Sequence, residues 1–224
     1  MIQENCCGYD INIILPDDYN IEKQYPALFL NDGNQIKLWN KHNCNYIIFG
    51  IIPNDRLENY TPWKSDAIRE NAPDFGGEAN EYIKVLVNGI IPELRKKYNV
   101  IEEKMIFGGI SLGGLAAVYS LFHTTRFPYI FSICGSFWYP NFSSYIMKEE
   151  ILNKRAHAFI INGLEEGKNH NNILEEAPQK AKIVQDQLKS KIDHCICVFD
   201  NYGHHDNMEK RIEEVQRWIE NNIN

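Results

Sequence analysis

One serine lies at the centre of a glycine-rich segment whose spacing could support catalysis. Gly109-Ile110-Ser111-Leu112-Gly113 follows an apolar run and precedes a run of small residues. This order predicts a buried strand, a sharp turn at Ser111 and a helix, because glycines two positions on either side let strand and helix almost touch. A serine at such a turn exposes its hydroxyl for nucleophilic attack; the alternative is an ordinary turn with a capping serine.

A serine hydroxyl attacks at neutral pH only with a base within reach and an acid that orients the base. The turn at Ser111 resembles the nucleophile elbow of α/β-hydrolases, where the acid and then the histidine follow on loops after later strands. Here two predicted strands, 156–162 and 194–199, are followed by Glu165-Glu166 and by His204-His205. Asp200, which also ends a strand, is an alternative acid.

The loop that contains the two histidines has other interpretations. His204, His205 and Asp206, together with His170, carry side chains that bind metals. Adjacent histidines in a strand-like segment point in opposite directions, however, so we expect no metal site. A solvated polar loop is the remaining alternative.

Two backbone amides are candidates for an oxyanion hole, which would stabilise the negative charge that develops on an attacked carbonyl. One is the amide of Leu112, directly after the serine. The other should come from the loop after the strand at 27–30, where Gly33 allows the chain to turn and Asn34 is the expected donor. A plain turn is the alternative at this second position.

The rest of the chain supplies the elements that must position these groups. Short apolar runs predict strands at 9–15, 25–30, 46–52, 104–110, 129–134, 156–162 and 194–199. Helical periodicity predicts helices at 77–98 (with a kink or restart at Pro92), 112–123, 143–152, 172–191 and 206–222. The alternation predicts one α/β domain over 1–224, with a mostly parallel sheet covered by helices on both faces. The long polar and aromatic segment 56–75 is expected to be a functional loop.

Charge and cysteine usage narrow the class of protein. The formal net charge of −7 disfavours nucleic acid and anionic membranes as partners, because both require clustered lysine and arginine. The N-terminus has no signal-peptide pattern, and no apolar stretch is long enough to span a bilayer. Six cysteines without a C-x-x-C pair suggest thiols in a reducing compartment. We therefore expect a cytoplasmic protein, and the sequence leaves a homo-oligomer open.

Several segments resemble the putative esterase family of α/β-hydrolases, which includes esterase D and the enterochelin esterases. The matching segments are 25–33 (ending in Asp-Gly), 56–63 (R-x-x-E-Y-T-P), 76–79 (G-G-x-A), 108–117 (the serine turn) and 136–138 (S-x-W). The resemblance implies a serine hydrolase that acts on a small-molecule carboxylic ester through an acyl-enzyme, without a cofactor.

Carried over by position, the resemblance makes Ser111 the nucleophile, Glu166 the acid and His205 the base. Glu165 is the fallback acid. The chain departs from the family pattern after the histidines, where Lys210 replaces the usual tryptophan and the spacing to the last helix is shorter. This departure keeps His204 open as the base.

Three further side chains are expected near the substrate. Trp63 and Trp138 could line the pocket or simply cover the core. Arg56 could bind substrate, although a structural pair with Glu58 that holds the 56–75 loop against the serine turn is the preferred interpretation. The alternative functions are acyl transfer to an alcohol, hydrolysis of a siderophore trilactone, and a non-catalytic binding protein that kept the fold.

Overall fold

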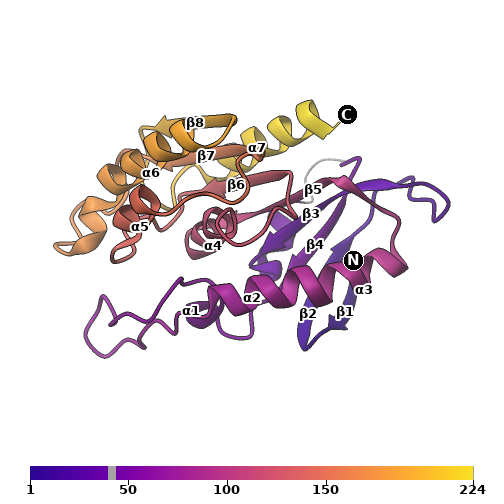
Figure 1. Cartoon of the computed structure of the whole chain (residues 1–224), viewed down its shortest axis with the longest axis horizontal. Coiled ribbons are helices and arrows are strands. Elements are labelled where there is room, and N and C mark those ends of the chain that lie inside the picture. Colours follow the sequence, from indigo (N-terminus) through magenta and orange to yellow (C-terminus); the bar gives the residue numbers. More distant parts are fainter. Residues whose placement is uncertain (40–43, 224) are drawn as a thin grey trace.

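A single eight-stranded sheet forms the centre of the computed structural model, which describes residues 1–39 and 44–223 (Figure 1). The strand order is β1-β2-β4-β3-β5-β6-β7-β8. The strands are β1 (Ile2–Cys6), β2 (Tyr9–Ile14), β3 (Tyr25–Asn31), β4 (Ile47–Ile51), β5 (Val100–Ile110), β6 (Tyr129–Ile133), β7 (His157–Gly163) and β8 (His194–Asp200). β1 and β2 are antiparallel to their neighbours, whereas β4, β3, β5, β6, β7 and β8 run parallel. This arrangement confirms the expected α/β fold with a mostly parallel sheet.

Helices cover both faces of the sheet. The helical segments are η1 (Gly33–Trp39), α1 (Arg56–Asn59), α2 (Ala79–Val85), η2 (Leu86–Ile90), α3 (Ile91–Lys97), α4 (Leu112–Ser120), α5 (Phe142–Lys148), η3 (Ile173–Glu176), α6 (Ala177–Lys191) and α7 (Met208–Ile223). α2 to α6 belong to one hydrophobic core, and η1 and α7 belong to the other.

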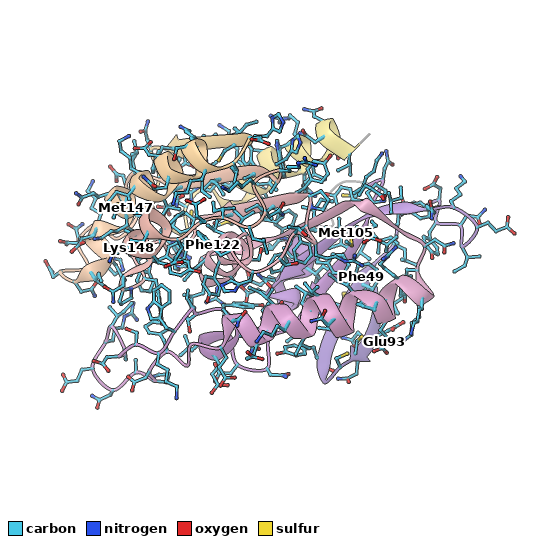
Figure 2. The ribbon with its side chains drawn as sticks, viewed as in Figure 1. Phe49, Glu93, Met105, Phe122, Met147 and Lys148 are labelled. Carbon is cyan, nitrogen blue, oxygen red and sulfur yellow. The ribbon has the colours of Figure 1, made fainter. Side chains whose placement is uncertain are left out.

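Along each central strand, successive side chains point to opposite faces of the sheet and so belong to different hydrophobic cores. Phe29 and Phe107 lie in the core beneath α2 to α6, whereas their neighbours Leu28 and Ile106 lie in the core beneath η1 and α7. Both sets are fully buried, as expected for parallel strands covered on two faces. Figure 2 shows Met105 and Phe49 between the sheet and the helix that contains Glu93.

The helix changes geometry just before Pro92, which agrees with the restart that the sequence suggested there. α2, η2 and α3 form one continuous helix over residues 79–97, and η2 has π-helical geometry. The widened turn ends with the amide of Ile91 donating to the carbonyl of Leu86. Pro92 then lies in the first turn of α3, where its missing N–H costs little.

Three elements were not anticipated from the sequence. β1 forms the edge of the sheet, η1 follows β3, and α1 lies inside the expected 56–75 loop. Asp55 caps the start of α1, and its carboxylate accepts hydrogen bonds from the amides of Leu57 and Glu58.

Among the described residues, no helix is both long and apolar enough to cross a bilayer.

Candidate active site

Ser111 occupies a sharp turn between β5 and α4. Its backbone has φ 59° and ψ −121°, a conformation that costs free energy for any residue with a side chain. The close approach expected around the turn is present, because a Cβ on Gly109 would lie 2.9 Å from the carbonyl carbon of Gly113 and 2.8 Å from Cβ of Asn31. Glycine at position 109 is therefore required by the packing of strand against helix.

The Ser111 turn is anchored to the loop after β6. The amide of Ser111 donates to the carbonyl of Ile133 at 2.9 Å, and the amide of Ser136 donates to the carbonyl of Ser111 at 3.1 Å. The hydroxyl oxygens of Ser111 and Ser136 also lie 3.1 Å apart. Ser136 is fully buried, so its contacts hold the backbone and the hydroxyl of Ser111 in place.

Glu166 holds a histidine through a short polar contact. Its Oε2 lies 2.7 Å from Nδ1 of His204. Its Oε1 accepts from the amide of Gly163 at 2.7 Å and from the side-chain amide of Asn162 at 3.2 Å. The carboxylate is only 4% exposed, so these three partners set its orientation.

The histidine beside Glu166 is His204, whereas His205 was the residue expected there from the family pattern. The two residues are consecutive in a short loop, and their rings stand at 85° to each other, so one imidazole faces Glu166 while His205 is exposed. The family pattern points to the next residue, His205, and the contact with Glu166 instead favours the alternative that the sequence left open. Glu165, the fallback acid, is exposed and forms an ion pair with Lys168.

Asp200, the alternative acid, pairs with a buried arginine. Arg211 of α7 is fully buried and donates to both carboxylate oxygens of Asp200, at 2.7 and 2.5 Å. Burial raises the pKa of Asp200, but the hydrogen bonds and charge of Arg211 outweigh it and hold that pKa below its usual value. The same guanidinium donates to the carbonyls of Gly203 and His204, at 3.0 and 3.3 Å. Arg211 thus anchors the backbone of the loop that contains His204 and His205 to the end of β8.

Arg56 is paired with Asp32 rather than with Glu58. Its Nε and Nη2 donate to the two carboxylate oxygens of Asp32 at 2.8 and 3.1 Å, and Nη2 also donates to the carbonyl of Ile110 at 3.2 Å. The amide of Asp32 in turn donates to the hydroxyl of the buried Tyr60. The 56–75 loop is therefore held against the serine turn, as expected, but through a different acid.

A cavity of about 750 Å³ opens over these groups. Ser111 and Glu166 line it together with both histidines, His204 and His205. Its apolar wall includes Leu57, Ile68, Pro73, Phe75, Leu112 and Trp138. Its charged and titratable lining includes Arg56, Arg69, Glu165, Lys168, His170 and Asp206. This mixture suits an organic substrate that has both an apolar and a charged part.

Of the remaining residues that the sequence pointed to, some line the cavity and others do not. Leu112, one expected oxyanion donor, lines the cavity, whereas Asn34 is exposed on η1 and is not among the described lining residues. Trp138 lines the cavity and packs on Phe75. Trp63 instead belongs to an aromatic cluster, and its indole N–H donates to the carbonyl of Pro140. Trp63 therefore covers the core.

The site is poorly suited to a metal ion. His204 and Glu166 lie near Sγ of Cys134, and the three ligand atoms are within 4.8 Å of one another. However, Nη1 of Arg211 donates to that sulfur at 2.8 Å and already supplies a positive charge. The grouping of His170, His204, His205 and Asp206 considered from the sequence is not among the ligand clusters of the described residues.

Sequence reasoning missed the partners that position the site. Ser136 and Asp32 belong to segments that matched the family pattern, S-x-W and Asp-Gly, which was the available signal. Arg211 lies in a helix that was predicted, but in no recognisable motif, and only the fold brings it to Asp200 and His204.

Comparison with known proteins identifies the class. The model of the family described as "Putative esterase" matches residues 3–211, so the chain belongs to this family, which places it among carboxylic ester hydrolases. The uncharacterized protein YbbA of Bacillus subtilis is 30% identical over 226 residues, covering 92% of this chain and 90% of that protein.

Two solved structures illustrate the shared fold. An IroE-like serine hydrolase from Shewanella oneidensis is 16% identical, with a TM-score of 0.74, covering 94% of this chain and 75% of that one. The siderophore hydrolase EstA from Aspergillus nidulans is 17% identical, with a TM-score of 0.71, covering 95% of this chain and 90% of that one.

Proposed function

We propose that this protein is a serine esterase that cleaves a carboxylic ester through an acyl-enzyme, with Ser111, His204 and Glu166 as its catalytic residues. The observation that carries the proposal is the 2.7 Å contact between Glu166 and Nδ1 of His204, in a cavity that Ser111 also lines. Family membership supports ester hydrolysis over the non-catalytic alternative.

In the proposed acylation step, Oγ of Ser111 attacks the ester carbonyl while Nε2 of His204 takes the hydroxyl proton. The contact of Nδ1 with Glu166 leaves Nε2 as the free nitrogen, and the carboxylate stabilises the imidazolium without accepting the proton. The carbon–oxygen bond to the alcohol then breaks, and His204 passes the proton to the leaving alkoxide. Water repeats the sequence to release the carboxylic acid and restore Ser111.

Two groups are proposed to assist this chemistry from the Ser111 turn. The amide of Leu112 follows the nucleophile at the start of α4 and would donate to the developing oxyanion. Ser136 lies 3.1 Å from Oγ of Ser111 and positions the hydroxyl before substrate arrives. The amide of Asn34, the second donor expected from the sequence, lies on η1 and is not among the described residues that line the cavity, so the proposal does not include it.

Product analysis tests the reaction. With a chromogenic ester we expect a burst of alcohol followed by steady turnover, and we expect Ser111→Ala to abolish both. Adding alcohol acceptors distinguishes hydrolysis from acyl transfer: hydrolysis predicts free carboxylic acid as the main product, whereas a main product of transferred ester would establish the alternative. Unchanged turnover by Ser111→Ala would contradict the proposal.

Hydrolysis of an anionic siderophore ester is the second, narrower candidate. Arg56, Arg69, Lys168 and His170 line the cavity, although Glu165 and Asp206 partly offset their charge. EstA, a protein of the same fold, bears the description siderophore hydrolase.

The cavity cations can be tested with a matched pair of esters, one anionic and one neutral. Replacing either Arg69 or Lys168 by Gln should raise KM for the anionic ester by up to about 5-fold, since an exposed pair contributes at most about 1 kcal/mol. KM for the neutral ester should not change, and Lys182→Gln, on α6 outside the cavity lining, is the control. Equal effects on both esters would contradict a role in binding anions.

A further inference from the structure

Two thiols and a carboxylate meet where the end of β1 and the turn after it contact α3. Cys6 ends β1, Cys7 lies in the turn between β1 and β2, and Glu93 projects from α3. Sγ of Cys6 donates to Oε2 of Glu93 at 2.9 Å, and Sγ of Cys7 lies 3.7 Å from the same oxygen. These residues do not line the catalytic cavity.

We propose that Cys6, Cys7 and Glu93 form a binding site for a thiophilic divalent cation of the zinc class. Their three ligand atoms lie within 4.8 Å of one another, so one ion could reach all three. Thiolates and a carboxylate are ligands that Zn²⁺ accepts together, whereas Mg²⁺ and Ca²⁺ prefer oxygen ligands.

The distances are compatible with tetrahedral coordination after a small adjustment. Bonds of about 2.3 Å to sulfur and about 2.1 Å to oxygen place a sulfur and an oxygen ligand about 3.6 Å apart. The Cys7–Glu93 separation of 3.7 Å already meets this value, and the Cys6–Glu93 separation of 2.9 Å must increase by a fraction of an ångström. Because Cys7 is exposed, water can occupy the fourth position.

The local backbone brings the ligands together from two elements. Cys7 has φ 52° and Gly8 has φ 82°, a tight turn that keeps the two adjacent sulfurs near the same helix. On the helix side, the π-helical segment η2 places Gly89 under Cys7, where a Cβ would lie 2.7 Å from the sulfur. π-helical turns are frequent at functional sites. Figure 2 labels Glu93 on the long helix at the lower right, next to this strand pair.

Binding must displace the thiol protons. Burial and the neighbouring carboxylate raise the pKa of Cys6, so without metal its thiol is protonated and donates to Glu93. Coordination by both thiolates releases two protons to solvent, and the ion keeps its oxidation state. The bound ion would join the β1–β2 pair to α3 and stabilise the folded protein by linkage.

The first experiment measures binding by the reduced full-length protein after chelator treatment. Titration with Cd²⁺ should produce the ultraviolet cadmium–thiolate band, which saturates at one equivalent, and Zn²⁺ should abolish the band by competition. Zn²⁺ at about 100 times its Kd should also raise the unfolding midpoint by roughly 5–10 °C. A protein that shows neither the band nor the shift would overturn the proposal.

Variants locate the site. Cys7→Ser and Glu93→Gln should each weaken binding at least tenfold and abolish the stabilisation, while ester hydrolysis stays unchanged. The matched control replaces Cys195 and Cys197 by Ser, since their sulfurs form another close pair at 3.4 Å. If this control loses the metal, or if Cys7→Ser and Glu93→Gln both bind as wild type, the assignment is wrong. Cys7 is exposed in a turn, so its variant tests the site even if Cys6→Ser does not fold.

Discussion

The two adjacent histidines have different surroundings, and this difference decides their expected roles. His204 contacts Glu166 and is one-quarter exposed, whereas His205 is exposed beside it. We predict that His204→Ala lowers kcat/KM by at least about 10⁴-fold, because the nucleophile loses its base. His205→Ala should change kcat/KM by less than about tenfold, since this ring lines the cavity without contacting the acid. Steady-state kinetics with one ester checks both variants, and the reverse ranking would restore His205 as the base.

Glu166 orients the imidazole, so a neutral isostere should impair the rate without unfolding the protein. Glu166→Gln keeps the size of the side chain but can present an N–H to His204 Nδ1, which favours the wrong tautomer. We expect kcat to fall by about 10³–10⁴-fold with little change in KM. Glu165→Gln is the matched control, because Glu165 is exposed and pairs with Lys168. Comparable losses in both variants would contradict the assignment of Glu166.

At the scale of elements, the crossing of β5 and α4 leaves no room for a methyl group. A Cβ on Gly109 would meet backbone and Cβ atoms at 2.9 and 2.8 Å. Gly109→Ala should lower the free energy of unfolding by about 1–3 kcal/mol through overpacking. It should also reduce ester turnover, because the strand and helix that hold Ser111 must separate. Urea unfolding with parallel activity assays measures both effects, and wild-type values would show that the turn relaxes freely.

The pair of Asp200 and Arg211 joins the end of β8 to α7 and should make stability depend on acid pH. The folded-state pKa of Asp200 is lowered, so its contribution to stability is present above the unfolded pKa of about 3.9. This contribution is lost as pH falls through the lower, folded-state pKa.

Removing the Asp200 charge should cost stability at neutral pH. Asp200→Asn leaves the fully buried Arg211 without its anion, which typically costs about 3–5 kcal/mol. Urea unfolding at neutral and acid pH should show a large loss that shrinks as pH falls. Arg211→Met should therefore cost less stability in the Asp200→Asn protein than in the wild-type protein, and equal costs in the two backgrounds would contradict the pairing.

For the molecule as a whole, the order of apolar and polar runs predicted most of the sheet. Seven of the strands and the helices that connect them follow from runs that are apolar throughout or periodic, because burial on two faces dictates those patterns. β1 was missed because only its last residue is buried, so its sequence carries no strong pattern. The restart expected at Pro92 is present, but the π-helical geometry of the turn before it was not predicted.

The site was predictable in part. The Ser111 turn is a local feature, and glycine spacing alone revealed it. His204 contacts Glu166 because of the path that the loop after β8 takes toward the end of β7. A shift of one residue along this loop would bring the neighbouring histidine there, so the choice is not readable from the spacing alone. Arg211 and Asp32 act through contacts between distant segments, which spacing in the sequence does not encode.

Covalent labelling of Ser111 tests the central claim most directly. A fluorophosphonate probe should form a bond from phosphorus to Oγ of Ser111 with loss of fluoride, in a reaction assisted by His204. Peptide mass spectrometry of the folded protein should find one adduct, on Ser111, which is absent from Ser111→Ala and from heat-unfolded protein, and much slower to form in His204→Ala. An unlabelled Ser111 in protein that still hydrolyses esters, or an adduct on another residue, would contradict the proposed mechanism.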